Sequence, residues 1–176
     1  SSDAAKTLTV SAAPAVTLSS NADDNAVCPA EELGFEASGA SSYTFKMNGV
    51  NMQTGTNSSW SASGFTDGDV VSVVGINSVG CSATDDITLT VYPGPTVDFA
   101  PVDAQCENSS PFVLTQGTPS GGSYSGTGVS TGAFYPQTAG IGVHTLSYTY
   151  TDGNGCSATA TEDITVNTLP DVSFSG

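Results

Sequence analysis

Hydrophobic and polar residues alternate in short stretches along the chain, and turn residues separate these stretches. Residues 33–37 alternate between apolar and polar or small side chains, which predicts a half-buried strand. Residues 43–47 alternate in the same way. The dipeptide that follows them, Asn48-Gly49, favours a two-residue hairpin turn because both positions accept positive φ. No window shows a sustained period of 3.6 residues, so the pattern predicts an all-β chain with no helix longer than one turn.

Further short strands are predicted in both halves of the chain. They cover residues 14–20, the stretch from Val50, residues 70–76, residues 82–92, a strand with Phe112 and Leu114, and residues 121–126, 134–136 and 143–151. In the last of these, His144, Leu146, Tyr148 and Tyr150 share one face. Short strands separated by turn signals predict β-sandwiches.

The sequence is built twice. Residues 80–84 (GCSAT) recur as residues 155–159, and in both copies the cysteine stands fourteen residues before a proline. A fixed internal period is typical of a tandem array. We therefore expect two β-sandwich domains at residues 14–93 and 94–168, with residues 1–13 as the last strand of a preceding repeat and residues 169–176 as the first strand of a following one.

The two flanking segments allow two interpretations. In a continuous array they belong to neighbouring repeats of the same protein, and this interpretation is favoured. In a polymer of identical short subunits they would complete the sheet of the next subunit by strand addition, which also covers exposed sheet edges.

Four cysteines are divided equally between the repeats. Cys28 and Cys81 are 53 residues apart, and Cys106 and Cys156 are 50 residues apart, so the matched spacing predicts one disulfide within each domain. A disulfide that closes a loop of this length stabilises a domain by about 4 kcal/mol in the chain-entropy model. A zinc site is disfavoured because there is no Cys-x-x-Cys and only one histidine. Disulfides indicate an oxidising compartment, so we expect an extracellular or cell-surface protein.

The charge of the chain excludes two classes of partner. The chain has two lysines, no arginine and a net charge of −15. Nucleic acid and anionic membrane surfaces both require clustered Lys and Arg, so neither is expected as a partner. No apolar run is long enough to span a bilayer, and direct membrane insertion is not expected either.

Several longer motifs resemble a known family. The chain looks like the immunoglobulin-like and PKD-like tandem repeats of large secreted or cell-surface proteins of Bacteroidota, which include adhesins, gliding-associated proteins and proteins exported by the type IX system. The motifs are residues 43–50 (YTFKMNGV), 65–73 (FTDGDVVSV), 80–84 (GCSAT), 121–129 (GGSYSGTGV), 138–145 (TAGIGVHT) and 148–156 (YTYTDGNGC). The resemblance implies immunoglobulin-like β-sandwiches that serve extracellular spacing, display and adhesion, and it implies no catalytic residues.

Catalysis is not expected from the residues themselves. A nucleophile needs a base beside it, and the single histidine, His144, falls in phase with the core residues Leu146 and Tyr148. Acidic residues stand mostly in turns and at strand ends, where they cap and solvate. We therefore predict that the chain is not an enzyme.

Calcium is the one metal that the sequence suggests, and no other cofactor is expected. The oxygen-rich turns offer weak candidate ligands at Asp67, Asp69, Asp152 and Asn154. None of these turns has the full calcium-binding loop, and Asp-Gly pairs form turns for backbone reasons alone.

The leading hypothesis is a structural and adhesive repeat of a long surface protein or filament, in which proline linkers make a disulfide-stabilised, semi-rigid spacer. Its partners would be neighbouring repeats or identical subunits, and a surface glycan or protein receptor. The alternative is a carbohydrate- or protein-binding accessory module of a secreted multidomain enzyme. That function requires exposed aromatic side chains, for which the weak candidates are Trp60, Tyr124 and Tyr135.

Overall fold

The computed structural model describes residues 10–22 and 24–170. Almost all of its regular structure is β-strand, and the one helix in this part of the chain is the single turn α1 (Pro136–Ala139). The predicted all-β class is therefore confirmed. The chain divides into two compact units, one that ends at Tyr92 and one that begins at Pro93.

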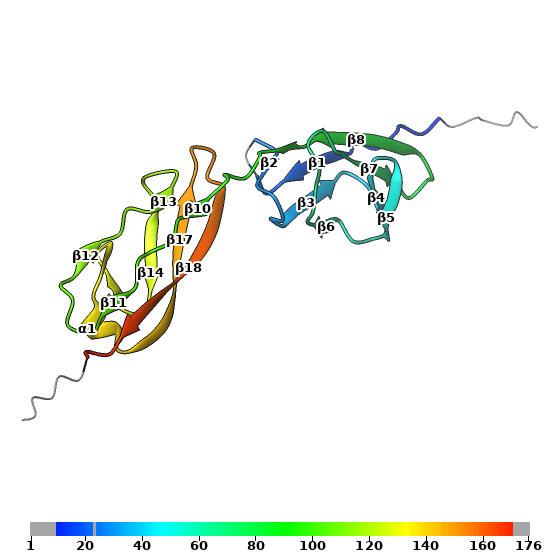
Figure 1. The fold of residues 1–176 in the computed structure, drawn as a ribbon. Coiled ribbons are helices and arrows are strands. Elements are labelled where there is room, and N and C mark those ends of the chain that lie inside the picture. The colour runs from blue at the N-terminus through cyan, green and yellow to red at the C-terminus, as the bar shows by residue number, and fades with distance from the viewer. Residues whose placement is uncertain (1–9, 23, 171–176) are drawn as a thin grey trace, which may run out of the picture. The chain divides into compact units, whose positions relative to one another are not determined.

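The first unit is a sandwich of a three-stranded sheet, β1-β3-β6, and a four-stranded sheet, β5-β4-β7-β8 (Figure 1). A short parallel pair, β2-β9, lies beside them. The strands are β1 (Thr17–Ser20), β2 (Ala26–Val27), β3 (Leu33–Ser38), β4 (Ser42–Met47), β5 (Val50–Gly55), β6 (Ser59–Ala62), β7 (Val70–Ile76), β8 (Ser82–Thr88) and β9 (Thr90–Val91).

The alternating pattern of the first unit determines its core. Along β3 every second side chain is buried, and along β4 Tyr43 and Phe45 are buried. These side chains meet Val71 and Val73 of β7 between the two sheets, which forms one apolar cluster. The predicted hairpin turn between β4 and β5 is present at Asn48-Gly49, where φ is 50° and 81°.

The second unit has the same plan with more interrupted strands. Its main sheet is β11-β18-β17-β14, and the smaller sheets β12-β16-β15 and β10-β13 complete the unit. The strands are β10 (Asp98–Phe99), β11 (Gln105–Cys106), β12 (Phe112–Val113), β13 (Gly117–Thr118), β14 (Ser123–Gly126), β15 (Val129–Ser130), β16 (Ala133–Phe134), β17 (Gly142–Thr151) and β18 (Ser157–Asn167).

Tyr148 of β17 is the centre of the second core. Its ring packs against the rings of Phe99 and Tyr124, and only 1% of the residue is exposed. Gly117 and Gly122 leave space for this ring, since a Cβ atom at either position would lie 2.5 Å from it. The two glycines are therefore required by packing rather than by turn geometry.

The chain enters and leaves the first unit at opposite ends. It enters beside the β7–β8 turn, where the side-chain amide of Asn77 donates to the carbonyl of Ala12 at 3.1 Å. It leaves after β9, where the N–H of Tyr92 donates to the carbonyl of Val27 at 3.1 Å. The extended chain of β8 and β9 connects these two ends, which we call the entry pole and the exit pole.

The second unit has the same two poles. Phe99, close to its start, contacts Tyr148, and Tyr148 pairs with Ala160 near the beginning of β18. β18 then leads away to Asn167, its last residue, at the opposite end of the unit. Within each unit, therefore, one end receives the chain and the opposite end releases it.

The two predicted flanking strands fall mainly on residues that the structure does not describe. Residues 1–9 and 171–176 lie outside the described residues, and residues 10–13 have no regular structure. Among the described residues, no helix is long and apolar enough to cross a membrane.

Candidate functional site

The four cysteines differ in their bonding state. Cys28 and Cys156 are disulfide-bonded, whereas Cys81 and Cys106 are free thiols. The predicted disulfides Cys28–Cys81 and Cys106–Cys156 are therefore not formed, and these predicted pairings are wrong.

The topology explains why the predicted pairs do not form. Cys28 follows β2 at the exit pole of the first unit, while Cys81 precedes β8 at the entry pole, about ten residues and roughly 30 Å of extended chain away. In the second unit Cys106 pairs with Asn167 at the end of β18, and Cys156 precedes the start of the same strand. A disulfide needs Cα atoms within roughly 7 Å, so neither internal pair can bond.

The two entry-pole cysteines occupy the same kind of turn. The N–H of Cys81 donates to the side-chain oxygen of Asn77 at 2.9 Å, and the N–H of Asn77 donates back to the carbonyl of Cys81 at 3.0 Å. Cys156 and Asp152 make the same two hydrogen bonds at 3.0 and 2.9 Å. The repeats therefore present this cysteine in one conformation.

The two exit-pole cysteines also match each other. The N–H of Cys28 donates to the carboxylate of Glu31 at 3.2 Å, and the N–H of Glu31 donates to the carbonyl of Cys28 at 3.2 Å. Cys106 and Ser109 form the same reciprocal pair at 3.1 and 3.0 Å. Cys28 directly follows the short strand β2 and Cys106 is the last residue of the short strand β11, and each of these strands pairs in parallel with the last strand of its unit.

Sequence reasoning named Asp152 only as a candidate calcium ligand, and it assigned none of the four residues a hydrogen bond to a cysteine. A signal for them exists, because Asn77 and Asp152 each stand four residues before a cysteine, and Glu31 and Ser109 each stand three residues after one. The repeat comparison aligned identical residues, and these positions share only the ability to accept a hydrogen bond.

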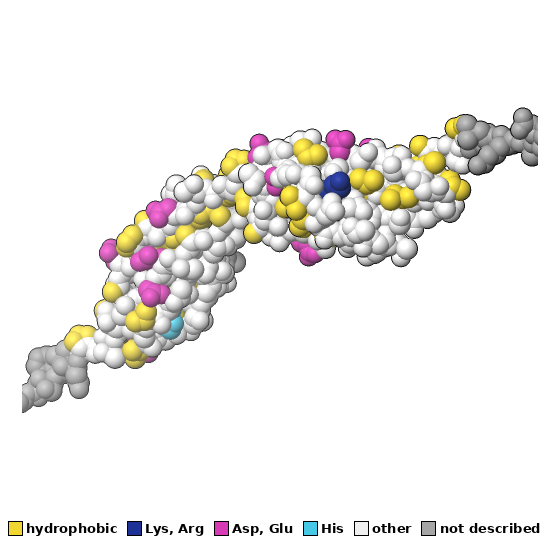
Figure 2. Space-filling model, turned by 90° about the vertical axis from the view of Figure 1, so that its right-hand side faces the viewer, with side chains coloured by type: hydrophobic (Ala, Val, Ile, Leu, Met, Phe, Trp, Pro, Cys, Tyr) yellow, Lys and Arg dark blue, Asp and Glu magenta, His cyan; other side chains and the backbone are white. Residues whose placement is uncertain are grey.

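The candidate calcium ligands are engaged in turns rather than gathered around a common point. Asp67 accepts from the N–H of Val91 at 3.0 Å, and Asp152 accepts from the N–H groups of Asn154 and Cys156. Within residues 10–22 and 24–170, no three His, Cys, Asp or Glu side chains converge as a metal site. On the face drawn in Figure 2, the acidic side chains are scattered over both units.

Asp69 ties two loops of the first unit together. Its carboxylate accepts from the N–H of Thr66 at 2.8 Å and from the side-chain amide of Asn48 at 2.8 Å. The hydrogen bond from the Thr66 backbone, followed by that from Asn48, lowers the pKa of Asp69 below its ordinary value. Asp69 thus holds the β4–β5 hairpin against the loop before β7.

His144 is part of the sheet framework. Its Nε2 atom lies 2.8 Å from the carbonyl oxygen of Gly140, on the loop that precedes the same strand. This contact holds the imidazole against the loop that precedes β17.

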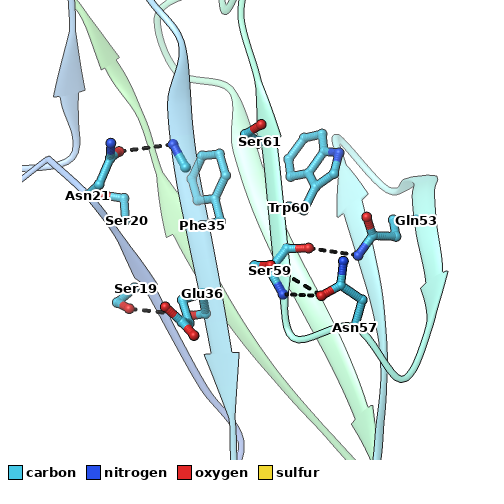
Figure 3. Close-up of a pocket in the computed structure, with 11 residues that line it drawn as sticks. Ser19, Ser20, Asn21, Phe35, Glu36, Gln53, Asn57, Ser59, Trp60 and Ser61 are labelled. Carbon is cyan, nitrogen blue, oxygen red and sulfur yellow. Dashed lines mark hydrogen bonds between the residues drawn. The ribbon is translucent and has the colours of Figure 1, made fainter.

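A polar groove of about 600 Å³ lies over the three-stranded sheet of the first unit (Figure 3). Gln53 donates to the carbonyl of Ser59 at 2.9 Å, and Asn21 accepts from the N–H of Gly34 at 2.9 Å. The carboxylate of Glu36 is exposed at the same surface. The groove is lined by Ser19, Ser20, Asn21, Gly34, Phe35, Glu36, Gln53, Asn57, Ser59, Trp60 and Ser61.

The three candidate aromatic residues do not form one binding platform. Trp60 is half-buried, and its indole stacks on the Phe35 ring with centroids 5.4 Å apart and an interplanar angle of 21°. In the second unit, the hydroxyl of Tyr124 accepts from the N–H of Gly117 at 2.6 Å within the core. Tyr135, in the same unit, lines a smaller hollow with Val129 and other residues.

Comparisons with known proteins find similar folds but no family. No family model matches the chain, and no curated protein matches it. Among solved structures, the fibronectin(III)-like modules of Clostridium thermocellum CbhA are 16% identical over 92% of this chain and 100% of theirs, with a TM-score of 0.40. A Ca²⁺-stabilised adhesin that helps an Antarctic bacterium bind ice is 16% identical, with a TM-score of 0.43.

The match to the Antarctic ice-binding adhesin covers 90% of this chain and 50% of the adhesin chain. A 1.5-MDa bacterial ice-binding adhesin is 20% identical over 89% of this chain and 66% of that one, with a TM-score of 0.39. Similarities at this level concern the general arrangement of strands, and they assign no activity to the chain.

Proposed function

We propose that this chain is a structural and adhesive segment of a long extracellular or cell-surface protein or filament, in which residues 14–93 and 94–168 are successive repeats. Each repeat would act as a spacer, and its surface loops would display binding groups. The protein would have no catalytic activity of its own.

The observation that supports this proposal is the placement of the poles within each unit. A domain that receives the chain at one end and releases it at the other adds its long dimension to an array. The longest strand, β18, has 11 residues, which corresponds to about 35 Å per repeat. A domain with both termini at one end would add little length.

The bonding state of two cysteines and the charge of the chain support an extracellular location. Disulfide bonds at Cys28 and Cys156 persist in oxidising compartments and are rare in the cytosol. The high negative charge supports the same location, because it favours solubility and is screened within about 10 Å at physiological salt. The prolines at positions 93, 95 and 170 fix φ in the linkers, which favours semi-rigid junctions.

The length of artificial arrays tests the spacer function. We would join one, two and four copies of the chain and measure their end-to-end length by electron microscopy. The proposal predicts that the length grows in proportion to the number of copies. Compact particles whose diameter grows only with the cube root of mass would contradict it.

The alternative, a carbohydrate- or protein-binding accessory module, is favoured by the polar groove on the first unit. Glu36 and Gln53 border the groove and offer hydrogen-bonding groups to a sugar. Binding of the wild type on a glycan array, reduced at least tenfold in Glu36→Ala and Gln53→Ala, would support this function. Glu162→Ala on the second unit is the matched control, and an array without wild-type binding would count against the alternative.

A further inference from the structure

We infer that the polar groove of the first unit binds a neutral glycan and rejects acidic glycans, and that preorganised amide groups hold the sugar by hydrogen bonds. This inference rests on the alternative function proposed above, binding of a carbohydrate, and it adds the class of sugar and the groups that recognise it. All residues that line the groove belong to the first unit.

Three amide side chains of the groove are each fixed at one end. The Oδ1 atom of Asn21 accepts from the N–H of Gly34 at 2.9 Å, and the N–H of Asn21 donates to the carbonyl of Gly34 at 3.0 Å. The Oδ1 atom of Asn57 accepts from the hydroxyl of Ser59 at 3.2 Å, and the Nε2 group of Gln53 donates to the carbonyl of Ser59 at 2.9 Å. Each amide is therefore oriented before a ligand arrives, which lowers the entropic cost of binding.

The other end of each amide is available to a ligand. Within the part of the chain that the structure describes, the Nδ2 groups of Asn21 and Asn57 and the Oε1 atom of Gln53 make no hydrogen bond. The carboxylate of Glu36 also makes none there. Asn21 and Glu36 lie on one side of the groove (Figure 3). Gln53 and Asn57 lie on the other side, so each side presents one amide donor and one oxygen acceptor.

This arrangement of donors and acceptors suits the hydroxyls of a sugar. A hydroxyl both donates and accepts, so a donor beside an acceptor can bind one hydroxyl or two neighbouring ones. Trp60 offers little stacking surface, because its indole packs against the rings of Phe35 and Phe45 with centroid distances of 5.4 and 6.2 Å. Recognition in this groove therefore depends on hydrogen bonds rather than on stacking.

The charge of the groove determines which class of sugar it accepts. The residues that line it include Glu36 but no Lys, Arg or His, and the whole chain has a net charge of −15. A uronic acid, a sialic acid or a sulfated sugar would bring an anion near the Glu36 carboxylate with no lining cation to pair with, and such like charges oppose binding. The hydroxyls of a neutral sugar can instead donate charge-assisted hydrogen bonds to this carboxylate.

A peptide suits the groove less well than a glycan. An extended peptide commonly binds by adding to an open strand edge. β6 is an edge strand, but the N–H of Ser59 on this strand donates to Asn57 at 3.4 Å and the carbonyl of Ser59 accepts from Gln53. The two apolar lining residues, Phe35 and Trp60, pack into the core of the unit and form no pocket for a peptide side chain.

Two isosteric variants test the amide donors. Asn21→Asp and Asn57→Asp keep the oxygen that accepts a hydrogen bond within the protein and replace the available NH2 group with a second oxygen. Asn51→Asp is the matched control, because it makes the same change of charge on β5 outside the groove. Wild type and the three variants, with folding checked by thermal melting, would be screened on arrays of neutral glycans, acidic glycans and random peptides. Calorimetry would then measure the affinity for the neutral glycan that the wild type binds most tightly.

We expect the wild type to bind neutral glycans and no acidic ones. Asn21→Asp and Asn57→Asp should each weaken this binding by about tenfold, whereas Asn51→Asp should bind like the wild type. Binding of acidic glycans, or equal affinity in all four proteins, would overturn the inference while the sugar-binding function stands. Binding of peptides alone would overturn the inference and leave a protein-binding module. If the wild type binds nothing on the arrays, the inference and the alternative function both fail, and the spacer function is unaffected.

Discussion

At the scale of single residues, the hydroxyl of Tyr148 joins two loops of the second unit. It donates a hydrogen bond to the carbonyl of Pro119 and accepts one from the N–H of Gly122 at 2.8 Å. Tyr148→Phe would keep the ring and leave both backbone groups without this partner in a buried site. We expect a loss of about 1–3 kcal/mol in the free energy of unfolding, measured by urea denaturation.

Tyr150→Phe is the control for this substitution. Tyr150 lies on the same strand, is half-buried, and its hydroxyl makes no hydrogen bond to another described residue. Its substitution should change the free energy of unfolding by less than about 0.5 kcal/mol. Equal effects of the two variants would show that the hydroxyl of Tyr148 has no special role.

Asp69 makes the first unit sensitive to acid. Its pKa is lowered in the folded state by the hydrogen bonds from Thr66 and Asn48. The folded pKa is therefore below the unfolded one, so Asp69 contributes stability above the unfolded pKa, about 3.9, and loses this contribution as pH falls through the folded pKa. Asp69→Asn should be less stable than wild type at pH 7, and the difference should shrink as the pH falls below about 4.

Thermal unfolding of wild type and Asp69→Asn across this pH range checks the prediction. If the melting temperatures of wild type and Asp69→Asn differ by the same amount at every pH down to pH 2, the ionised carboxylate adds nothing to stability beyond what the amide provides.

At the scale of elements, Gly75 sets how closely β7 approaches the chain that leads into β1. A Cβ atom at this position would lie 2.5 Å from Cγ2 of Val16 and 2.7 Å from Cβ of Ala40. Gly75→Ala therefore overpacks the first core and should cost about 1–3 kcal/mol in chemical denaturation. Gly34→Ala is the control, because its Cβ would meet only Asn21 at 3.8 Å, and a similar loss in both variants would refute the packing argument.

The position of the cysteines on the strands predicts how each unit responds to reduction. Because Cys106 and Cys156 lie at opposite ends of β18, no disulfide closes a loop within that unit. Reduction should change the free energy of unfolding of each unit by less than about 1 kcal/mol, whereas loss of an internal disulfide in a small domain costs about 2–5 kcal/mol. Differential scanning calorimetry with and without a phosphine reductant distinguishes these results.

The longer strands were predictable from sequence because each has a local signal of its own. β3, β4 and β17 alternate over six or more residues, β7 is a nearly continuous apolar run, and Asn48-Gly49 identifies the hairpin between β4 and β5. The strands β2 and β11 have two residues each, which is too short for a period to appear. Their parallel pairing with the last strand of each unit is a long-range contact, and it places Cys28 and Cys106 at the exit pole.

The candidate site was predictable only in part, because it also depends on contacts between residues that are far apart in the sequence. Matched spacing showed correctly that the cysteines of the two repeats are equivalent, but spacing along the chain does not report which pole a residue occupies. Trp60 was a candidate binding residue on composition alone, and the structure places its indole against the rings of Phe35 and Phe45. The groove around Glu36 and Gln53 depends on strands that meet only in the folded unit, so no local pattern indicated it.

At the scale of the whole molecule, each unit is a sandwich in which the chain passes from one pole to the other. Under the proposed function, an array of such units would gain length with every repeat. In an array of the kind proposed, the net charge of −15 would oppose lateral association at low salt, because like charges repel.

The bonding state of the cysteines in the native, unreduced chain tests this account most directly. Alkylation under denaturing conditions followed by mass spectrometry of proteolytic fragments should label Cys81 and Cys106 and leave Cys28 and Cys156 unlabelled. A chain with no labelled cysteine, whose fragments show Cys28 joined to Cys81 and Cys106 joined to Cys156, would contradict it.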